Sequence, residues 1–219
     1  MNKTAIISGT SNGIGKKTAE LFLERNWKVA GIDMMPASLI NDNYRHYQLD
    51  LRYDKLPALP EADVLVCNAG LQGTENDLEA NILPATRLCE AVIHTQPAAI
   101  LFVASASAIT GAEFPLYSAS KGAVVSYMRN VAIRCAKWGG ICNAISPGGV
   151  KTELNRPVME DRQLWEKIME LTPLRRWSEA EEIAEWIWFL TVTNKSMTGE
   201  NLLIDNGETR LNAEFVWPG

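Results

Sequence analysis

The chain has 219 residues, of which 47% are apolar and 21% charged, and its formal net charge is −5. These values are typical of a folded globular protein and exclude a disordered or collagen-like chain. The acidic balance argues against nucleic acid as the main partner, because phosphate binding requires a basic face. The length predicts a single domain over residues 1–219.

Short apolar runs rich in β-branched residues alternate along the chain with segments of helical periodicity. The runs predict strands at Thr4–Ser8, Lys28–Ile32, Arg45–Leu49, Val64–Cys67, Ala99–Val103, Ile141–Ile145 and Asn201–Ile204. The periodic segments predict helices at Gly13–Arg25, Asp77–His94, Tyr117–Trp138 and Ser178–Leu190, with Ser178 as the cap of the last. This alternation predicts an α/β fold: one Rossmann-type doubly wound sheet of about seven mostly parallel strands, with helices on both faces.

The connections between strands 2, 3 and 4 are short for helical crossovers. The first contains Pro36, and the second contains Pro57 and Pro60. Proline breaks helix interiors. We therefore expect one connection to form a short turn of helix and the other to be mostly irregular.

The sequence contains no segment that resembles a signal peptide or a membrane-spanning helix. We therefore expect a cytoplasmic protein that does not enter a membrane. Cys67, Cys89, Cys135 and Cys142 lack the spacing of metal ligands. We expect buried, reduced thiols and no metal site.

A glycine-rich turn, Gly9-Thr10-Ser11-Asn12-Gly13-Ile14-Gly15, joins the first strand to the first helix. Glycine lets the backbone approach a pyrophosphate, and the amino end of the helix stabilises phosphates. The order of strand, turn and helix predicts a dinucleotide site. An ordinary strand-to-helix turn is the alternative reading of these glycines.

Asp33 ends the second strand. A carboxylate there can accept hydrogen bonds from an adenosine ribose and would repel a 2′-phosphate, which favours NAD over NADP. Lys16 and Lys17 would weaken this preference, so NADP stays open. A solvated turn aspartate is the alternative.

Tyr117 and Lys121 lie four residues apart at the start of the longest predicted helix and so share a face. A neighbouring cation lowers the pKa of a phenol, which then exchanges a proton with a carbonyl or an alcohol. Ser105 follows the strand Ala99–Val103 and would hold the substrate oxygen beside the phenol. Ser107 competes for this role, and the alternative for either serine is to satisfy only a backbone group at the strand end.

Taken together, these motifs resemble those of the short-chain dehydrogenase/reductase family, in the family's order and over nearly the whole chain. Ser8–Gly15 resembles T-G-x-x-x-G-I-G, and Cys67-Asn68-Ala69-Gly70 resembles N-N-A-G with cysteine for the first asparagine. The other matches are Asp50-Leu51, Asn81-Ile82, Ser105, Tyr117 with Lys121, Pro147-Gly148-Gly149-Val150-Lys151-Thr152, Thr198-Gly199-Glu200 and Asp205-Asn206-Gly207. The shortened first half is similar to the branch that contains bacterial 3α-hydroxysteroid dehydrogenase/carbonyl reductase.

The resemblance implies an NAD(P)-dependent oxidoreductase that interconverts an alcohol and a ketone by hydride transfer. It implies Tyr117 as general acid/base, Lys121 as the group that lowers its pKa, Ser105 as the residue that orients the substrate, and Asn81 as the anchor of a relay water. The cofactor-binding residues that it implies are Gly9, Ser11, Asn12, Gly13, Ile14, Gly15, Asp33, Asp50, Leu51, Asn68, Ala69, Gly70, Tyr117, Lys121, Pro147, Gly148, Val150 and Thr152.

Residues 153–173 are expected to form a substrate lid. Trp165, Ile168 and Leu171 would lie on a mobile amphipathic helix over an apolar substrate, and ordinary core packing is the alternative. We expect a small hydrophobic alcohol or ketone, such as a steroid or a 3-oxoacyl compound. Glu113 would face the substrate or be a solvated loop acid.

Trp186 and Trp188 are two residues apart and cannot share a helix face. We therefore expect a homodimer or homotetramer that also uses Tyr127 and Met128, whereas packing of Trp188 within its own chain is the alternative. A non-catalytic dinucleotide-binding or structural protein of the same fold is the competing function. An epimerase or dehydratase is a third, but its G-x-x-G-x-x-G and longer substrate domain are missing.

Overall fold

The computed structural model describes residues 3–112 and 114–211. The first half of this part contains β1 (Thr4–Ser8), α1 (Gly13–Glu24), β2 (Lys28–Asp33), β3 (Tyr44–Gln48), β4 (Val64–Cys67), α2 (Asp77–Val92), η1 (Ile93–Thr95) and β5 (Ala99–Val103). The second half contains α3 (Ser107–Thr110), α4 (Pro115–Cys135), η2 (Ala136–Trp138), β6 (Ile141–Pro147), β7 (Val150–Lys151), η3 (Glu153–Asn155), α5 (Arg156–Glu160), α6 (Arg162–Leu171), β8 (Ser178–Glu179), α7 (Ala180–Trp188), the π-helical turn η4 (Phe189–Thr193) and β9 (Asn201–Ile204).

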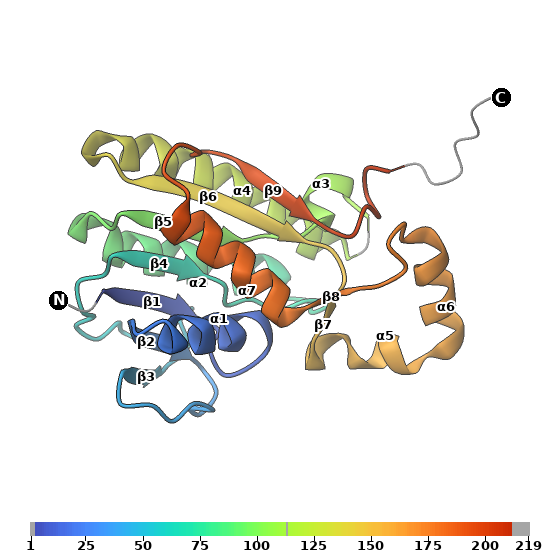
Figure 1. The fold of residues 1–219 in the computed structure, drawn as a ribbon, viewed down its shortest axis with the longest axis horizontal. Coiled ribbons are helices and arrows are strands. Elements are labelled where there is room, and N and C mark those ends of the chain that lie inside the picture. Colours follow the sequence, from blue (N-terminus) through green and yellow to red (C-terminus); the bar gives the residue numbers. More distant parts are fainter. Residues whose placement is uncertain (1–2, 113, 212–219) are drawn as a thin grey trace.

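The main sheet has seven strands within these residues, in the order β3-β2-β1-β4-β5-β6-β9 (Figure 1). Each of its pairings is parallel. The predicted doubly wound parallel sheet is therefore confirmed. The strand order reverses between β1 and β4; in sheets of this kind the ligand crevice lies at such a reversal, outside the carboxyl ends of the strands. A separate pair, β7 with β8, was not predicted.

Two helical layers cover the faces of the sheet. Helices α1 and α7 lie on one face and α2 and α4 on the other (Figure 1). Successive strand residues point to opposite faces, so Ile6 packs in the α2–α4 layer and Ile7 in the α1–α7 layer. Phe22, Leu88 and Ile183 are fully buried beneath these helices. The strands are apolar on both faces because both faces are covered.

The connections on either side of β3 contain no helix in the structure. Residues 34–43 are irregular, and residues 50–54 form one hydrogen-bonded turn in which Asp54 N donates to Asp50 O (2.9 Å). The prediction of an irregular connection is confirmed for residues 34–43, whereas the expected short turn of helix is only a hydrogen-bonded turn. Ile40 is fully exposed as a result. The β3 side of the sheet is therefore thinly covered.

The expectation that Met128 faces a partner is wrong. Its side chain is fully buried between α4 and the sheet, on the same helix face as Val124 and Val131. Residues at i, i+4 and i+7 form one stripe on a helix, and this stripe faces the core. Tyr127 lies beside it, and its hydroxyl donates to Glu90 Oε1 (2.6 Å) within the same chain.

The start of α7 also differs from the prediction. Ser178 belongs to β8, and the N-cap of α7 is Glu179, whose side chain forms a capping box with Glu182. Trp188 packs edge-on against Phe22 (4.9 Å between ring centroids) and against Trp27. The alternative of packing within the chain therefore holds for Trp188. Trp186 stays partly exposed.

All four cysteines are buried free thiols, as expected. No helix in the described ranges is long and apolar enough to cross a membrane. Glu113, for which two roles were considered, lies outside the described residues.

Met128→Ala should lower the free energy of unfolding by about 2–5 kcal/mol, because it leaves a cavity in a close-packed core. The matched control is Ile133→Ala on the same helix, where the side chain is 71% exposed; it should change stability by about 0.5 kcal/mol or less. Urea unfolding of the two variants measures both values. Equal losses would contradict the burial described for Met128.

Candidate active site

The segments singled out in the sequence meet at one edge of the sheet. The glycine-rich turn follows β1, Asp33 ends β2, Asn68 follows β4, Ser105 follows β5 and Pro147 ends β6. Parallel strands place their carboxyl ends on the same side, and the crevice between β1 and β4 opens there. The topology therefore gathers at one edge residues that are far apart in the sequence, from Gly9 to Pro147.

The turn between β1 and α1 has glycine, and so no side chain, at positions 9, 13 and 15. Gly9 has φ +75°, and its N–H donates to Ile32 O (2.8 Å). A β-carbon on Gly9 would lie 2.5 Å from Asn68 Nδ2, and one on Gly15 would clash with the carbonyl of Gly9. Only glycine fits these two positions. The turn leads into the amino end of α1, so it fits the pyrophosphate of a dinucleotide.

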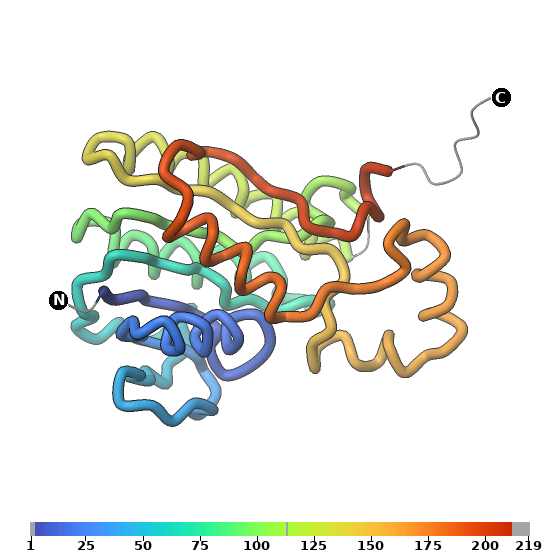
Figure 2. The backbone as a smooth tube through the Cα atoms, viewed as in Figure 1, coloured from blue at the N-terminus to red at the C-terminus, as the bar shows by residue number. Residues whose placement is uncertain are grey.

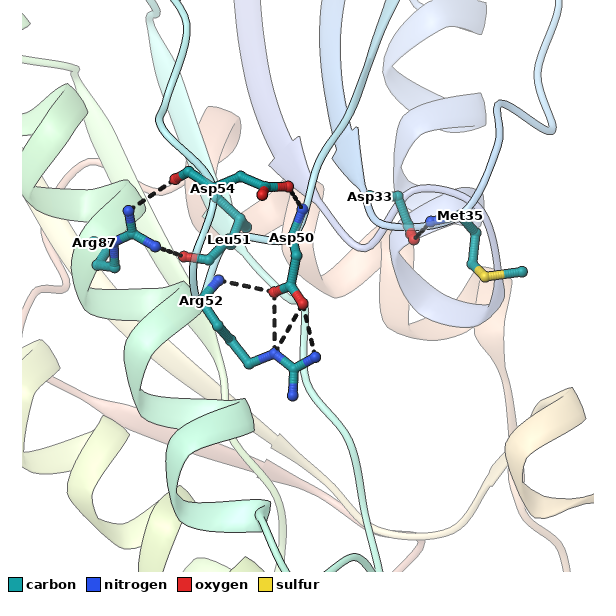
Figure 3. A network of polar contacts seen from close by, with 7 residues as sticks. All are labelled: Asp33, Met35, Asp50, Leu51, Arg52, Asp54 and Arg87. Carbon is teal, nitrogen blue, oxygen red and sulfur yellow. Dashed lines mark hydrogen bonds and ion pairs between the residues drawn. The ribbon is translucent and has the colours of Figure 1, made fainter.

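Asp33 is held at the rim of this turn. Its Oδ2 accepts from Ser11 N (2.9 Å). Its Oδ1 accepts from Met35 N (2.9 Å) (Figure 3). The carboxylate is therefore fixed by two backbone donors and is not a freely solvated turn residue. Its remaining lone pairs are available to a ribose hydroxyl.

The loop after β3 is closed by two arginines that the sequence reading did not single out. Arg52 pairs with the Asp50 carboxylate (Nη2–Oδ2 2.7 Å) and holds the pKa of Asp50 below its usual range (Figure 3). Arg87 on α2 donates to Leu51 O (2.6 Å) and to Asp54 O (2.8 Å). Asp50 is therefore already paired with Arg52, and Leu51 is buried.

Asn68 and Ser8 join β1 to β4 across the crevice. Ser8 Oγ accepts from Asn68 N (2.9 Å) and from Ala69 N (3.0 Å). Asn68 Nδ2 donates in return to Ser8 O (3.1 Å). Cys67, which replaces the first asparagine of the motif, is buried and donates to Ala85 O (3.7 Å). The substitution therefore falls on a core-facing position and leaves the crevice unchanged.

Lys121 is buried, with 6% of its surface exposed, and its Nζ donates to Val103 O (3.1 Å). The Tyr117 ring centroid lies 5.6 Å from this Nζ. Burial disfavours the charged form and lowers the pKa of Lys121 to about 8. The structure thus brings Tyr117 and Lys121 together as the sequence spacing predicted.

Asn81 lies next to this lysine and is also buried. Its Nδ2 donates to Asp77 O (2.7 Å) and to Leu71 O (2.9 Å). A β-carbon on Gly70 would clash with Asn81 Oδ1 and lie 3.3 Å from Lys121 Nζ. Gly70 is therefore the position at which the backbone lets Asn81 and Lys121 approach each other.

Asp77 is a buried acid that the sequence reading missed. Its carboxylate accepts from Gly73 N (2.9 Å), Thr74 N (2.9 Å) and Thr74 Oγ1 (2.6 Å). Burial alone would raise the pKa of Asp77, but the hydrogen bonds from Thr74 and Gly73 and the charge of Lys121 outweigh it and lower the pKa. The available signal was an acid in the first turn of a helix, one turn before Asn81.

The two candidate serines take different positions. Ser105 is half-buried, and its Oγ accepts from Ser107 N (3.2 Å) and Ser107 Oγ (3.0 Å). Ser107 is buried at the start of α3. Ser107 therefore supports the hydroxyl of Ser105, and Ser105 is the more accessible of the two.

The segment Pro147–Thr152 lies against the glycine-rich turn. A β-carbon on Gly13 would be 3.4 Å from Thr152 Cγ2. Gly148 N donates to Ile204 O (2.9 Å), and Val150 is buried where β7 pairs with β8. These contacts place the backbone of this segment beside the crevice.

The expected lid loops out beyond the carboxyl edge of the sheet (Figure 2). No residue of α6 is buried, so the core-packing alternative is wrong for this helix. Trp165 packs edge-on against Trp177 (5.0 Å between ring centroids), and Trp177 is buried against Gly149. Helix α6 therefore contacts the segment Pro147–Thr152 through this aromatic pair.

Across residues 3–112 and 114–211, no group of three or more His, Cys, Asp or Glu side chains is placed to hold a metal ion.

The chain matches a family model described as enoyl-(acyl carrier protein) reductase over residues 57–209. The NAD-dependent glycerol dehydrogenase of Listeria innocua is 31% identical over 240 residues, which cover 95% of this chain and 94% of that protein. A crystal structure of an oxidoreductase of the short-chain dehydrogenase/reductase family from Burkholderia thailandensis has a TM-score of 0.85 at 25% identity, covering 97% of this chain and 94% of that chain. The structure of ElxO with NADP bound has a TM-score of 0.82 at 26% identity, covering 95% and 99%.

Ser8→Ala should lower the free energy of unfolding by about 1–3 kcal/mol, because two backbone N–H groups lose their buried acceptor. Ser38→Ala is the matched control. Ser38 is exposed and donates only to Ser11 O (2.9 Å), so water can replace it and the change should be about 0.5 kcal/mol or less. Urea unfolding measures both, and a Ser8→Ala value no larger than the control would contradict the junction.

Proposed function

This chain belongs to the short-chain dehydrogenase/reductase family, and from that premise we propose that it interconverts an alcohol and a ketone, with Tyr117 as general acid/base. One observation carries the proposal. A buried lysine ammonium lies beside the Tyr117 ring (5.6 Å from Nζ to the centroid), at the edge of the sheet where the glycine-rich turn opens. The family's dehydrogenases and reductases act on CH–OH groups.

The site fits a nicotinamide dinucleotide. Gly9 and Gly15 let the turn before α1 pack closely on itself and on Asn68, where a β-carbon would clash, and the amino end of α1 beside them suits a pyrophosphate. The relative from Listeria innocua is NAD-dependent by name, and ElxO binds NADP. Bound there, the nicotinamide would supply the hydride donor or acceptor. The residues that we assign to the pyrophosphate and ribose are Gly9, Ser11, Asn12, Gly13, Ile14, Gly15 and Asp33, with Asp50, Leu51, Asn68, Ala69, Gly70, Pro147, Gly148, Val150 and Thr152 around the rest.

The protein's own side chains handle the proton. Lys121, whose pKa of about 8 keeps it mostly protonated at pH 7, stabilises the phenolate of Tyr117 electrostatically. Tyr117 Oη takes the proton from a substrate hydroxyl in oxidation and returns it to the carbonyl oxygen in reduction. Ser105 Oγ, supported by Ser107, donates a hydrogen bond to the same substrate oxygen. Asn81 fixes the backbone of residue 71 beside Lys121.

We assign a hydrophobic alcohol or ketone as the substrate. Leu154, Leu164 and Leu171 of the lid are exposed, and Leu174, directly after it, is exposed as well. Apolar surface at the mouth of the site favours an apolar ligand. A steroid or a 3-oxoacyl compound has this character, and a polyol such as glycerol is the contrasting substrate for a test.

We also assign a homodimer or homotetramer. Trp186 and Phe189 form an edge-on pair (6.0 Å between centroids), and both are partly exposed on the outer face of α7 and η4. Exposed aromatic pairs of this kind are enriched at interfaces between subunits.

Tyr117→Phe should lower kcat by about 10²–10⁴-fold, because the proton no longer has an acceptor or donor, while the dissociation constant of the dinucleotide stays within about threefold. The control is Tyr127→Phe on the same helix, which removes only the hydrogen bond to Glu90. Turnover is followed by the absorbance of the reduced nicotinamide on steroid, 3-oxoacyl and polyol substrates. Dinucleotide binding by the wild type without turnover on the whole panel would favour the non-catalytic alternative.

Asp33→Asn should reduce the preference for NAD over NADP at least about tenfold in kcat/KM, because the carboxylate no longer repels the 2′-phosphate. Asp42→Asn removes an exposed charge from the same connection and should leave the preference unchanged. A wild type that prefers NADP would refute the role assigned to Asp33.

A further inference from the structure

The edge strand β3 carries a tyrosine and a histidine on one face of the sheet. Side chains alternate along a strand, so Tyr44 and His46 lie on the same face, and Tyr44 packs with the α1–α7 layer. His46 Nε2 lies 3.0 Å from Met35 O, in the irregular connection 34–43. The strand therefore contacts the backbone of the segment that directly follows Asp33.

Gly31 lets the side chain of Tyr44 cross the neighbouring strand β2. A β-carbon on Gly31 would clash with Tyr44 Oη and with Thr10 Oγ1, which are 2.9 Å apart. Thr10 is fully buried in the glycine-rich turn, so this hydrogen bond ties the edge strand to the turn after β1. Burial raises the pKa of Tyr44, so the phenol keeps its hydrogen at neutral pH and can donate it.

These groups form a chain of hydrogen bonds that runs in one direction. Met35 O can only accept, so a neutral His46 ring carries its hydrogen on Nε2, 3.0 Å from that oxygen. Nδ1 then has no hydrogen and accepts from Tyr44 Oη (2.8 Å). Because the phenol has a single hydrogen, its oxygen accepts in turn from Thr10 Oγ1. The chain thus runs from the glycine-rich turn through both side chains of β3 to the backbone of Met35.

Met35 is in turn the residue that fixes one oxygen of Asp33. Its N–H donates to Asp33 Oδ1 (2.9 Å) (Figure 3). The Met35 side chain is exposed, so the position of this residue depends on its backbone hydrogen bonds. Ser11 Oγ is 3.4 Å from Met35 O and donates at 2.9 Å to Pro36 O. The shorter of the two contacts to Met35 O is therefore that of His46.

We propose that His46 is a positioning residue for cofactor binding, which acts through Met35 to aim the Asp33 carboxylate at the 2′-hydroxyl of the adenosine ribose. The proposal rests on the proposed function, because it acts through the carboxylate that we assign to that ribose. A carboxylate that is fixed before binding loses less freedom when it accepts the hydroxyl, which strengthens binding. Without a donor at position 46, Met35 is held less firmly, and the contribution of the 2′-hydroxyl to affinity falls.

The first test locates the hydrogen on the His46 ring without cofactor. The chain contains 2 histidines, and His94→Phe assigns their ¹⁵N-imidazole NMR resonances in the full-length protein. At a pH where titration shows both rings to be neutral, His46 should carry its hydrogen on Nε2. A ring with its hydrogen on Nδ1 could not donate to Met35 O and would overturn the proposal.

The second test compares the dissociation constants of NAD and of its analogue with 2′-deoxyadenosine, measured by titration calorimetry. His46→Phe should raise the dissociation constant of NAD about threefold or more, because the Asp33 carboxylate is fixed less firmly. The constant of the deoxy analogue, which has no 2′-hydroxyl, should change less than about twofold. A purely structural loss would weaken both ligands equally, and that result would overturn the proposal.

Two variants serve as matched controls for this comparison. His46→Gln keeps a side-chain amide that can donate to Met35 O and accept from Tyr44, so it should restore the ratio of the two dissociation constants. His94→Phe makes the same exchange at the exposed histidine of η1 and should leave both constants unchanged. A change of the ratio in His94→Phe equal to that in His46→Phe would contradict the role of His46.

If His46→Phe lowers the unfolding temperature strongly, Tyr44→Phe interrupts the same chain by loss of a hydroxyl and should shift the ratio in the same direction. An unchanged ratio in these variants overturns the role of His46 alone, because the wild type still binds the dinucleotide. A wild type that binds neither NAD nor NADP would instead refute the proposed function, and this proposal with it.

Discussion

The hydroxyl of Ser8 accepts hydrogen bonds from two successive backbone N–H groups at the end of β4, and the rest of the site depends on this junction. It holds β1 and β4 together at the point where the strand order reverses. Asn68 then reaches the glycine-rich turn, where a β-carbon on Gly9 or Gly15 would clash. A crevice lined by bare backbone is therefore a consequence of sheet topology and of a few side chains that seal its base.

The thin side of the molecule, around β3, is held by side chains rather than by helices. Arg87 reaches from α2 to two carbonyls of the loop after β3, and Arg52 closes on Asp50 in the same loop (Figure 3). On β3, Tyr44 Oη and Thr10 Oγ1 share a hydrogen bond (2.9 Å). Charge-assisted hydrogen bonds from Arg87 satisfy backbone carbonyls of this irregular loop, which has no regular backbone hydrogen-bond pattern. None of these bonds involves a proposed catalytic residue, so the short connections around β3 are fixed independently of those residues.

Electrostatics at the site are set by burial more than by sequence neighbours. Lys121 lies in the first turns of α4, where its charge would be inexpensive in water, but the helix presses it against β5. Burial lowers the pKa of Lys121 to about 8. The carbonyl that accepts its hydrogen bond, Val103 O, belongs to β5, which lies beside α4 only because the helix packs on this face of the sheet.

The sequence alone was sufficient for the strands, most helices and the order of the motifs, because these depend on local periodicity and on short spacings such as that of Tyr117 and Lys121. The sequence also predicted that the connections around β3 lack full helices, because proline excludes a regular helix there. The helix faces were less predictable. From the sequence, Met128 is expected at the surface beside Tyr127. Only the position of α4 on the sheet shows that Met128 lies on the buried stripe of the helix. The tertiary structure alone decided that Arg87 holds the loop after β3, that Ser8 joins β1 to Asn68 and that Trp188 packs against Phe22. These relations depend on which segments the crossovers bring together and on how deeply they are buried, and neither is a property of neighbouring residues in the chain.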